Sequence, residues 1–376
     1  MWSSRCRSLS SSTIRSGSYQ LRRICSGLRS RAGRCLLLRI IMASKKEIVV
    51  SGIRSTGYLH LGNYFGAMRN YVKMQSEYDC YFFVADYHSL TTHPDPKDLK
   101  ANVFRVLAEN IASGLDPEQV ALYAQSDIPE IPELYLMLNM LAYKGELEKV
   151  PTFKDKVRQQ PENVNAGLLT YPVLMAADIL IHRAVKVPVG KDQEQHLEMA
   201  RNFAQRYNSR YGELFPEPQP FNFGSELIKV MSLDGGGGKM SKSENENATI
   251  FLADSDEAIR KKVMKAKTDS GPTEANSEKP TYIQSLFDLM RLVSADETVA
   301  SFDSAYNACN IRYGDMKKQL AEDMVAFVAP IRERAAELQR DEAALRSILK
   351  RGAEKARESA SRTIDLARKG IGINYY

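Results

Sequence analysis

Short apolar runs alternate with longer helix-like patterns in the first two thirds of this 376-residue chain. The candidate strands lie at residues 47–53, 79–85, 120–125 and 185–189, and the candidate helices at 61–75, 97–114 and 192–207. Strands that are apolar along their whole length and are joined by helices are typical of a parallel sheet covered on both faces. The sequence therefore predicts an α/β fold with a doubly wound, Rossmann-like parallel sheet.

The character of the chain changes after Phe251. Residues 254–376 show helical patterns without a convincing strand and are rich in Arg, Lys, Glu and Ala. We therefore expect an α/β catalytic domain over residues 43–250 and an α-helical domain over 251–376. Composition alone favours a solvated helical bundle for the second domain.

The first 42 residues differ from the rest in charge. They hold nine Arg and ten Ser but no Lys, Asp or Glu, so the net charge of +6 becomes 6 − 9 = −3 for residues 43–376. This composition is typical of an organellar transit peptide, disordered or cleaved, with the mitochondrion expected first and the plastid as the alternative. A secretory signal fits less well because Arg39 interrupts Leu36–Leu38, whereas an RNA-binding arm stays open. Met42 offers an internal start for an untargeted cytosolic form.

Several function classes find no support in the composition. The five cysteines lack CxxC spacing, so we expect no disulfide scaffold, zinc site or iron–sulfur cluster, and no metal site. The sequence contains no run of eighteen apolar residues, so we expect no membrane-spanning helix. The motifs HExxH and GxSxG and the EF-hand pattern are absent, which argues against zinc hydrolysis, acyl-serine chemistry and calcium sensing.

Two glycine-containing segments have the chemistry of phosphate sites. The first is the turn Ser51–Gly57, followed by His60-Leu-Gly-Asn63, where Gly62 would let a ligand approach a helix start. His60 taken alone could equally be an ordinary polar residue. The second is Gly235–Ser243, which lacks the P-loop spacing but presents Lys239 and Lys242 on a glycine run. Paired cations there suit a loop that closes over a polyphosphate, and a disordered surface loop is the alternative.

Two further segments point to an apolar ligand pocket. Asp178 lies within an apolar run, and a buried carboxylate needs a partner. That partner is either a nearby group such as His182 or a lysine, or a polar hydrogen on a bound apolar ligand. Residues 187–196 lead from a strand to a helix start, where ligands bind in open α/β sheets. Leu134–Tyr143 is apolar almost all round and is expected in the core or in a subunit interface.

Taken together, these segments resemble the class I aminoacyl-tRNA synthetases. His60-Leu-Gly-Asn63 is similar to the HIGH element of that family, and Lys239-Met-Ser-Lys-Ser243 is identical to its KMSKS element. Within the class, Leu168–Leu180 and Val187–Glu198 resemble the tryptophanyl-tRNA synthetases of bacteria and organelles. Further agreement lies at residues 145–148, 153–156, 230–233 and 268–270, so the resemblance covers nearly the whole chain after the leader.

The resemblance implies a two-step ligation of L-tryptophan to tRNA(Trp) through tryptophanyl-adenylate, with ATP and Mg²⁺ as the substrate complex. It also implies a homodimer and a helical domain that reads the anticodon. By motif match, the catalytic residues are His60, Lys239, Lys242 and Lys156. The ATP-binding residues are Arg54, Ser55, Thr56, Gly62, Asn63, Gly190, Lys191, Asp192, Val230, Lys239, Met240, Ser241, Lys242 and Ser243. The tryptophan-binding residues are Asp178, Tyr171, Met175, His88, Val187, Val189 and Gln193, of which Asp178 would accept the indole N–H.

One departure and three alternatives accompany this reading. Arg54-Ser55 stands where many relatives have Gln-Pro, so Arg54 could contact phosphate directly. The alternatives are a tyrosyl-tRNA synthetase, a small HxGH nucleotidylyltransferase, and a non-catalytic paralogue that only binds tRNA or a partner. The KMSKS-like loop and helical domain argue against the second, and the intact Lys239, Lys242, His60 and Asp178 against the third.

Overall fold

The computed structural model describes residues 46–55, 57–190, 193–221, 229–240 and 245–376. The chain separates into two units, Met1–Lys46 and Glu47–Tyr376. The leader at residues 1–42 lies outside the described residues, and everything below concerns the second unit.

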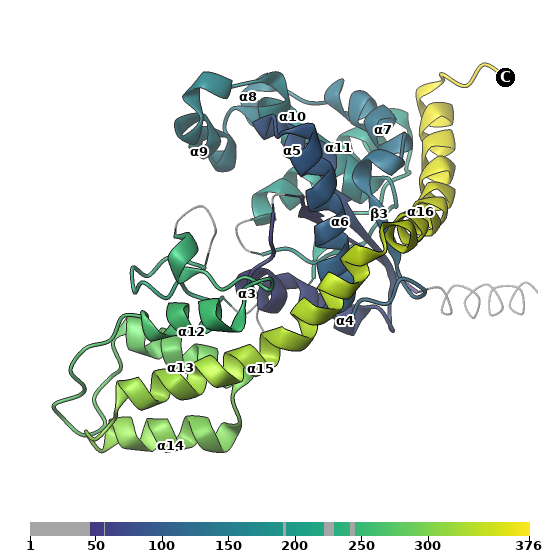
Figure 1. Ribbon diagram of the computed structural model, residues 1–376. Coiled ribbons are helices and arrows are strands. Elements are labelled where there is room, and N and C mark those ends of the chain that lie inside the picture. The colour runs from purple at the N-terminus through teal and green to yellow at the C-terminus, as the bar shows by residue number, and fades with distance from the viewer. Residues whose placement is uncertain (1–45, 56, 191–192, 222–228, 241–244) are drawn as a thin grey trace, which may run out of the picture. The chain divides into compact units, whose positions relative to one another are not determined.

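A five-stranded sheet forms the centre of this unit (Figure 1), with strand order β3-β2-β1-β4-β5 and every pair parallel. The strands are β1 (Ile48–Arg54), β2 (Asp79–Ala85), β3 (Ala121–Ala124), β4 (Lys186–Val187) and β5 (Gln219–Pro220). The predicted doubly wound sheet is confirmed. Because the order reverses between β1 and β4, their carboxyl ends border the crevice where ligands bind in such folds.

Alternate residues of the strands build a core on each face of the sheet. Val49 and Phe82 pack into one apolar cluster, whereas Val50 and Phe83 pack into the other. This alternation explains why the strands are apolar along their whole length. The edge strand β5 was not predicted, because its two residues are exposed and lack an apolar run.

The helices of the α/β part follow the strands. After β1 come α3 (Leu61–Asn63), the π-helical turn η2 (Tyr64–Met68) and α4 (Arg69–Met74), which together span the helix expected at 61–75. The others are α5 (Asp86–Ser89), α6 (Pro96–Ala112), α7 (Glu130–Asn139), α8 (Lys144–Leu147), α9 (Pro151–Gln159), α10 (Ala166–Leu180) and α11 (Glu194–Tyr211). Short 3-10 turns are η3 (Leu90–Thr92), η4 (Gln125–Asp127), η5 (Pro161–Asn163) and η7 (Glu246–Ala248).

Residues after 251 are helical throughout their regular elements, as predicted. These are α12 (Asp256–Met264), α13 (Thr281–Val293), α14 (Asp296–Asn307), α15 (Tyr313–Arg340) and α16 (Glu342–Ile371). No helix among the described residues has the length and apolar character needed to cross a membrane.

The last helix joins the helical segment to the sheet. Helix α16 lies beside the edge strand β3 and α7 (Figure 1), and buries a seam of small residues there. A Cβ at Gly352 would overlap the backbone of Leu122 in β3, so the helix approaches the strand as closely as a glycine permits. Arg368 also forms a two-point ion pair with Glu133 of α7, at 2.6 and 2.7 Å. The helical residues therefore form one compact unit with the α/β residues rather than a separate body.

Part of the apolar segment 134–143 lies in the core, which confirms that expectation, whereas the expectation of a subunit interface stays a prediction. Leu134 and Leu138 are fully buried in the core. Leu136, Met140 and Tyr143 are 57%, 75% and 64% exposed. The segment therefore has one core-facing side and one apolar side without a cover in the described chain.

Candidate active site

The two predicted phosphate-binding segments meet at the carboxyl end of β1. The Leu61 N–H donates to the Ile250 carbonyl at 3.0 Å, and the Leu252 N–H donates to the Leu59 carbonyl at 2.8 Å. These bonds pair His60 with Phe251 in an antiparallel bridge. The segment that follows the lysine-bearing loop is thus fixed directly to the start of α3.

Gly62 allows two groups of the chain itself to pack closely at the start of α3. A Cβ at this position would lie 2.9 Å from the His60 ring and 3.4 Å from the Met240 carbonyl oxygen. The Leu61 N–H at this helix start is already bonded to the Ile250 carbonyl. The close approach of a ligand at Gly62 therefore stays a prediction.

His60 is a neutral hydrogen-bonding group rather than a cation. Burial lowers its pKa to about 4, so the imidazole carries no charge at neutral pH. Its Nδ1 atom is buried without a hydrogen-bond partner among the described residues. The His60 side chain also belongs to a capping box with Asn63 at the start of α3, which is the ordinary helix-start role considered from the sequence. In that box the Asn63 side chain accepts the His60 backbone N–H at 3.0 Å, and a role of His60 in ligand binding stays a prediction.

A short hairpin presents the lysine-bearing loop. The Met240 N–H donates to the Val230 carbonyl at 2.8 Å. The Met240 and Val230 side chains are buried, whereas Lys239 is exposed. Gly235 and Gly237 have φ values of 72° and 74°, in the region that favours glycine. The glycine run forms a turn that leads to Lys239, and closure of this loop over a polyphosphate stays a prediction. Ser241, Lys242 and Ser243 lie outside the described residues.

Lys156 of α9 and Arg54 at the end of β1 are two cationic side chains whose charges interact. Lys156 lies 4.4 Å above the Tyr171 ring. Burial, together with the charge of Arg54, lowers the pKa of Lys156 to about 8. A polyanion would relieve the mutual repulsion of these two cations.

The structure describes some of the remaining residues predicted to bind ATP but not others. Ser55 is buried and its hydroxyl bonds to that of Ser89 at 2.9 Å, so its side chain anchors the turn. Gly190 follows β4 by three residues, and its carbonyl accepts the Gln193 N–H at 2.8 Å. Thr56, Lys191 and Asp192 lie outside the described residues.

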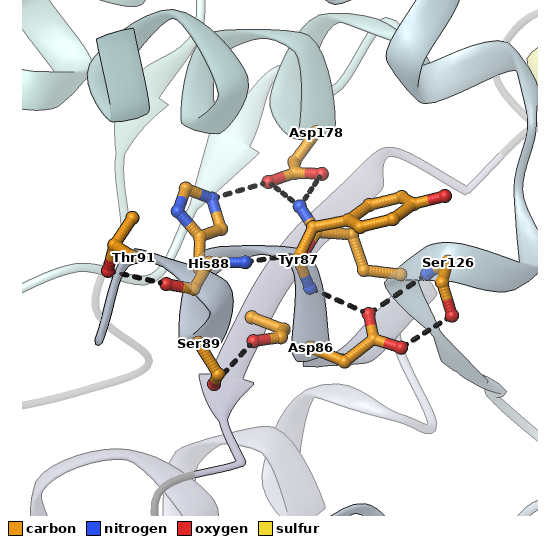
Figure 2. Close-up of polar contacts among 9 residues, drawn as sticks. Asp86, Tyr87, His88, Ser89, Thr91, Ser126 and Asp178 are labelled. Carbon is orange, nitrogen blue, oxygen red and sulfur yellow. Dashed lines mark hydrogen bonds and ion pairs between the residues drawn. The ribbon is translucent and has the colours of Figure 1, made fainter. Parts of the chain in front are cut away.

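Asp178 is buried on α10 and is held by two side chains from other elements. His88 Nε2 lies 3.1 Å from Asp178 Oδ2 (Figure 2), and Gln125 Nε2 donates to Oδ1 and Oδ2 at 2.8 and 2.9 Å. Burial raises the pKa of the Asp178 carboxyl, while the bonds from His88 and Gln125 oppose this rise.

His182, the partner considered for Asp178 from helical spacing, is elsewhere engaged. Its Nε2 bonds to the Tyr123 hydroxyl at 3.0 Å, and its ring stacks on Tyr81. That expectation is corrected, because tertiary packing against β2 and β3 determines where His182 points.

Other predicted tryptophan-pocket residues surround Asp178. Tyr171 and Met175 precede it at seven and three residues on α10, so they share one helix face. The Tyr171 and His88 rings are 6.3 Å apart. Val187 ends β4 and Val189 follows it, with Val187 buried and Val189 half-buried.

A polar chain links this pocket to the segment that carries Lys156. The Tyr171 hydroxyl bonds to His196 Nε2 at 2.5 Å and also to Thr152 of α9. His196 Nδ1 bonds to Gln193 Oε1 at 2.8 Å. The sequence reading named Tyr171 and Gln193 but not the histidine that joins them.

Three site residues were missed from the sequence: Gln125, Thr152 and His196. Gln125 follows the last residue of β3, and a polar residue at the carboxyl end of a parallel strand is a signal that could have found it. His196 stood within the quoted segment 187–198. Thr152 carries no comparable signal.

Comparison with known proteins identifies the family. The family model of "tRNA synthetases class I (W and Y)" matches residues 42–329. The tryptophan–tRNA ligase of Porphyromonas gingivalis is 60% identical over 328 residues, covering 87% of this chain and 99% of the relative. The chain belongs to the class I tryptophanyl-tRNA synthetases.

Solved members of this family share its fold. Tryptophanyl-tRNA synthetase from Campylobacter jejuni, in complex with ADP and tryptophan, superposes with a TM-score of 0.76 at 34% identity, covering 86% of this chain and 99% of that one. The enzyme from Mycoplasma pneumoniae gives 0.76 at 31% identity, covering 87% and 98%. The resemblance inferred from the sequence is confirmed, in favour of a tryptophan–tRNA ligase over the tyrosyl alternative.

Proposed function

We propose that this chain ligates L-tryptophan to tRNA(Trp) in two steps, with Mg²⁺-bound ATP as the first co-substrate. Two observations carry the proposal: the segments of Gly62 and Met240 lie in contact, and the buried Asp178 carboxylate is held by His88 and Gln125 from the carboxyl-end loops of β2 and β3. The Campylobacter jejuni relative was solved with ADP and tryptophan, which is the same ligand chemistry.

In the first step, a carboxylate oxygen of tryptophan attacks the α-phosphorus of ATP. The bond from that phosphorus to its bridging oxygen breaks, and pyrophosphate leaves as tryptophanyl-adenylate forms. The chain contributes positioning and charge rather than a covalent intermediate. Arg54, Lys156 and Lys239 stabilise the phosphate charge, and neutral His60 supplies a hydrogen bond.

Selection of the amino acid depends on Asp178. A buried carboxylate that is already held in place can accept the indole N–H of tryptophan. Phenylalanine would leave that carboxylate without its last donor, and such a loss discriminates strongly between ligands.

In the second step, a terminal ribose hydroxyl of tRNA(Trp) attacks the activated carbonyl, and AMP leaves. We propose that the helices in residues 251–376 read the anticodon. After the leader is set aside, residues 43–376 carry a net charge of 6 − 9 = −3, so RNA binding requires a local basic surface on these helices.

The test is amino-acid-dependent ATP–pyrophosphate exchange with residues 43–376. We expect exchange with tryptophan and none with tyrosine. Exchange with tyrosine alone would overturn the substrate assignment. No exchange with any amino acid would instead favour a non-catalytic binding module.

We also propose a homodimer that covers the exposed side of α7. Leu136 of α7 and Met140 and Tyr143 of the segment that follows it are large exposed apolar side chains. Sedimentation at micromolar concentration should give a dimer, and Met140→Glu should shift it toward monomer. A wild-type monomer under these conditions would reject the proposal.

We propose, finally, that residues 1–42 direct the chain to an organelle matrix, the mitochondrion first and the plastid as alternative. The support is the acid-free, Arg- and Ser-rich composition. Fusion of residues 1–42 to a fluorescent protein should give organellar fluorescence, and a start at Met42 a cytosolic form. Binding of RNA by residues 1–42 without import would favour the RNA-binding arm.

A further inference from the structure

Gln125 is a fully buried polar side chain at the carboxyl end of β3. Its Nε2 donates to both oxygens of Asp178, at 2.8 and 2.9 Å. Its Oε1 accepts the backbone N–H of His88 at 3.4 Å. One uncharged side chain therefore ties together the end of β3, the start of α5 and the middle of α10.

The hydrogen bonds at Asp178 leave one oxygen less occupied than the other. Oδ2 contacts both Gln125 Nε2 and His88 Nε2, whereas Oδ1 contacts Gln125 among the described residues. Each carboxylate oxygen accepts two hydrogen bonds comfortably. Oδ1 therefore has capacity to accept one more hydrogen bond than the described residues supply.

We propose that Gln125 is a positioning residue that fixes the Asp178 carboxylate so that Oδ1 accepts the ring N–H of tryptophan. Gln125 thereby sets the preference for an amino acid whose ring carries a donor. This inference rests on the proposed function and adds to it a residue that does not itself touch the substrate.

Gln125 suits this task better than His88 does. The His88 side chain is 12% exposed and holds one oxygen, whereas Gln125 is fully enclosed and holds both. The amide nitrogen always carries hydrogens to donate, whereas an imidazole nitrogen of a neutral ring donates in only one of the two tautomers. A buried donor with two contacts fixes the plane of the carboxylate before the ligand arrives.

The other charged and titratable groups near Asp178 do not replace this donor. Asp86 of α5 disfavours the ionised carboxylate and is itself occupied by Ser126 (Figure 2). Tyr123 of β3 bonds to His182 of α10. Among the described residues, His88 is therefore the other side chain bonded to Asp178, and loss of Gln125 removes two of the three bonds that stabilise the ionised carboxylate.

The experiment compares tryptophan with an analogue whose ring has sulfur in place of the N–H, β-benzothienylalanine. Pyrophosphate exchange is measured for wild type and Gln125→Met, which keeps the side-chain length but has no donor. We expect kcat/KM for tryptophan to fall about tenfold or more, mainly through KM, while KM for ATP and kcat/KM for the analogue change little. The preference for tryptophan over the analogue falls by the same factor. Equal losses for both amino acids would overturn the proposal.

A second variant gives a readout that a purely structural role would not move. In Gln125→Glu the new carboxyl donates only when protonated, so KM for tryptophan should improve as pH falls. Wild type should show the opposite trend, because protonation of Asp178 removes its acceptor. Parallel pH profiles for the two enzymes would overturn the proposal.

Asn110→Leu is the matched control. Asn110 is a buried amide on α6, and its side chain donates to the carbonyl of Val106 in the same helix. This variant should leave the tryptophan-to-analogue ratio unchanged even if it lowers Tm, and an equal change in that ratio would overturn the proposal. Wild type without tryptophan-dependent exchange would overturn the proposed function as well, which distinguishes the two failures.

Discussion

Gly62 and Met240, far apart in sequence, lie against each other at the start of α3. A Cβ on Gly62 would be 3.4 Å from the Met240 carbonyl oxygen. The backbone of the lysine-bearing loop therefore lies in contact with the helix start that we propose to hold the ATP phosphates. Shape at this contact, and not charge alone, should determine how the two segments cooperate.

Gly62→Ala should lower catalysis with little effect on folding. The new Cβ would lie 2.9 Å from the His60 ring, so that ring must move. We expect kcat for tryptophan-dependent exchange to fall about tenfold, equivalent to about 1.4 kcal/mol in the barrier. Gly145→Ala is the control, because no described atom lies within 4 Å of its Cβ position. An unchanged kcat for Gly62→Ala would contradict the view that close packing at Gly62 matters for catalysis.

Lys156 should give the enzyme an alkaline limit. Its pKa is lowered to about 8 by burial and by Arg54, so its positive charge is lost as pH rises through 8. We therefore expect kcat/KM for ATP, which reports the free enzyme, to fall between pH 7 and 9. Lys156→Arg should remove this fall because arginine stays charged. Arg54→Met should move it to higher pH, and a fall at the same pH in Arg54→Met would contradict the electrostatic link.

Glu109 should make stability depend on pH. This buried carboxyl accepts the Leu59 N–H at 3.0 Å, and burial raises its pKa to about 8. Between about pH 4.5 and 8 the folded chain holds a proton that the unfolded chain has released. Stability therefore falls as pH rises, by up to about 1.4 kcal/mol per unit from this group. We expect the free energy of unfolding of Glu109→Gln, measured relative to wild type in urea titrations, to be higher at pH 8 than at pH 5. A constant difference between the two proteins would reject this interpretation.

Gly352→Ala should destabilise the fold where α16 meets β3. Its Cβ would overlap the Leu122 backbone, which cannot move as a side chain can. We expect a loss of about 1–3 kcal/mol in the free energy of unfolding. Gly314→Ala in α15 has no described atom within 4 Å and should be neutral or slightly stabilising. Similar effects at both glycines would indicate that the close approach is unimportant.

The sequence predicted those parts of the molecule that local patterns encode. The strand expected at 79–85 coincides with β2, and the helix expected at 97–114 lies within two residues of α6. These elements carry a complete apolar pattern of their own. The short β5 does not, because its place is determined by pairing with β4.

The site was predictable where one segment holds the chemistry, and less so where several meet. Asp178 was found because a carboxylate in an apolar run needs a partner. Its partners His88 and Gln125 come from other elements, and helical spacing pointed to His182 instead. Contacts between elements depend on tertiary packing, which a periodic pattern does not record.

The position of α16 against β3 has a consequence for folding during synthesis on the ribosome. Strand β3 leaves the ribosome long before α16, the helix that covers it, because the two are more than 200 residues apart. Until α16 has emerged, the nascent chain presents an uncovered sheet edge, the kind of surface that pairs with other chains. Emergence of α16, rather than completion of the α/β part, is therefore the event that removes this exposed edge.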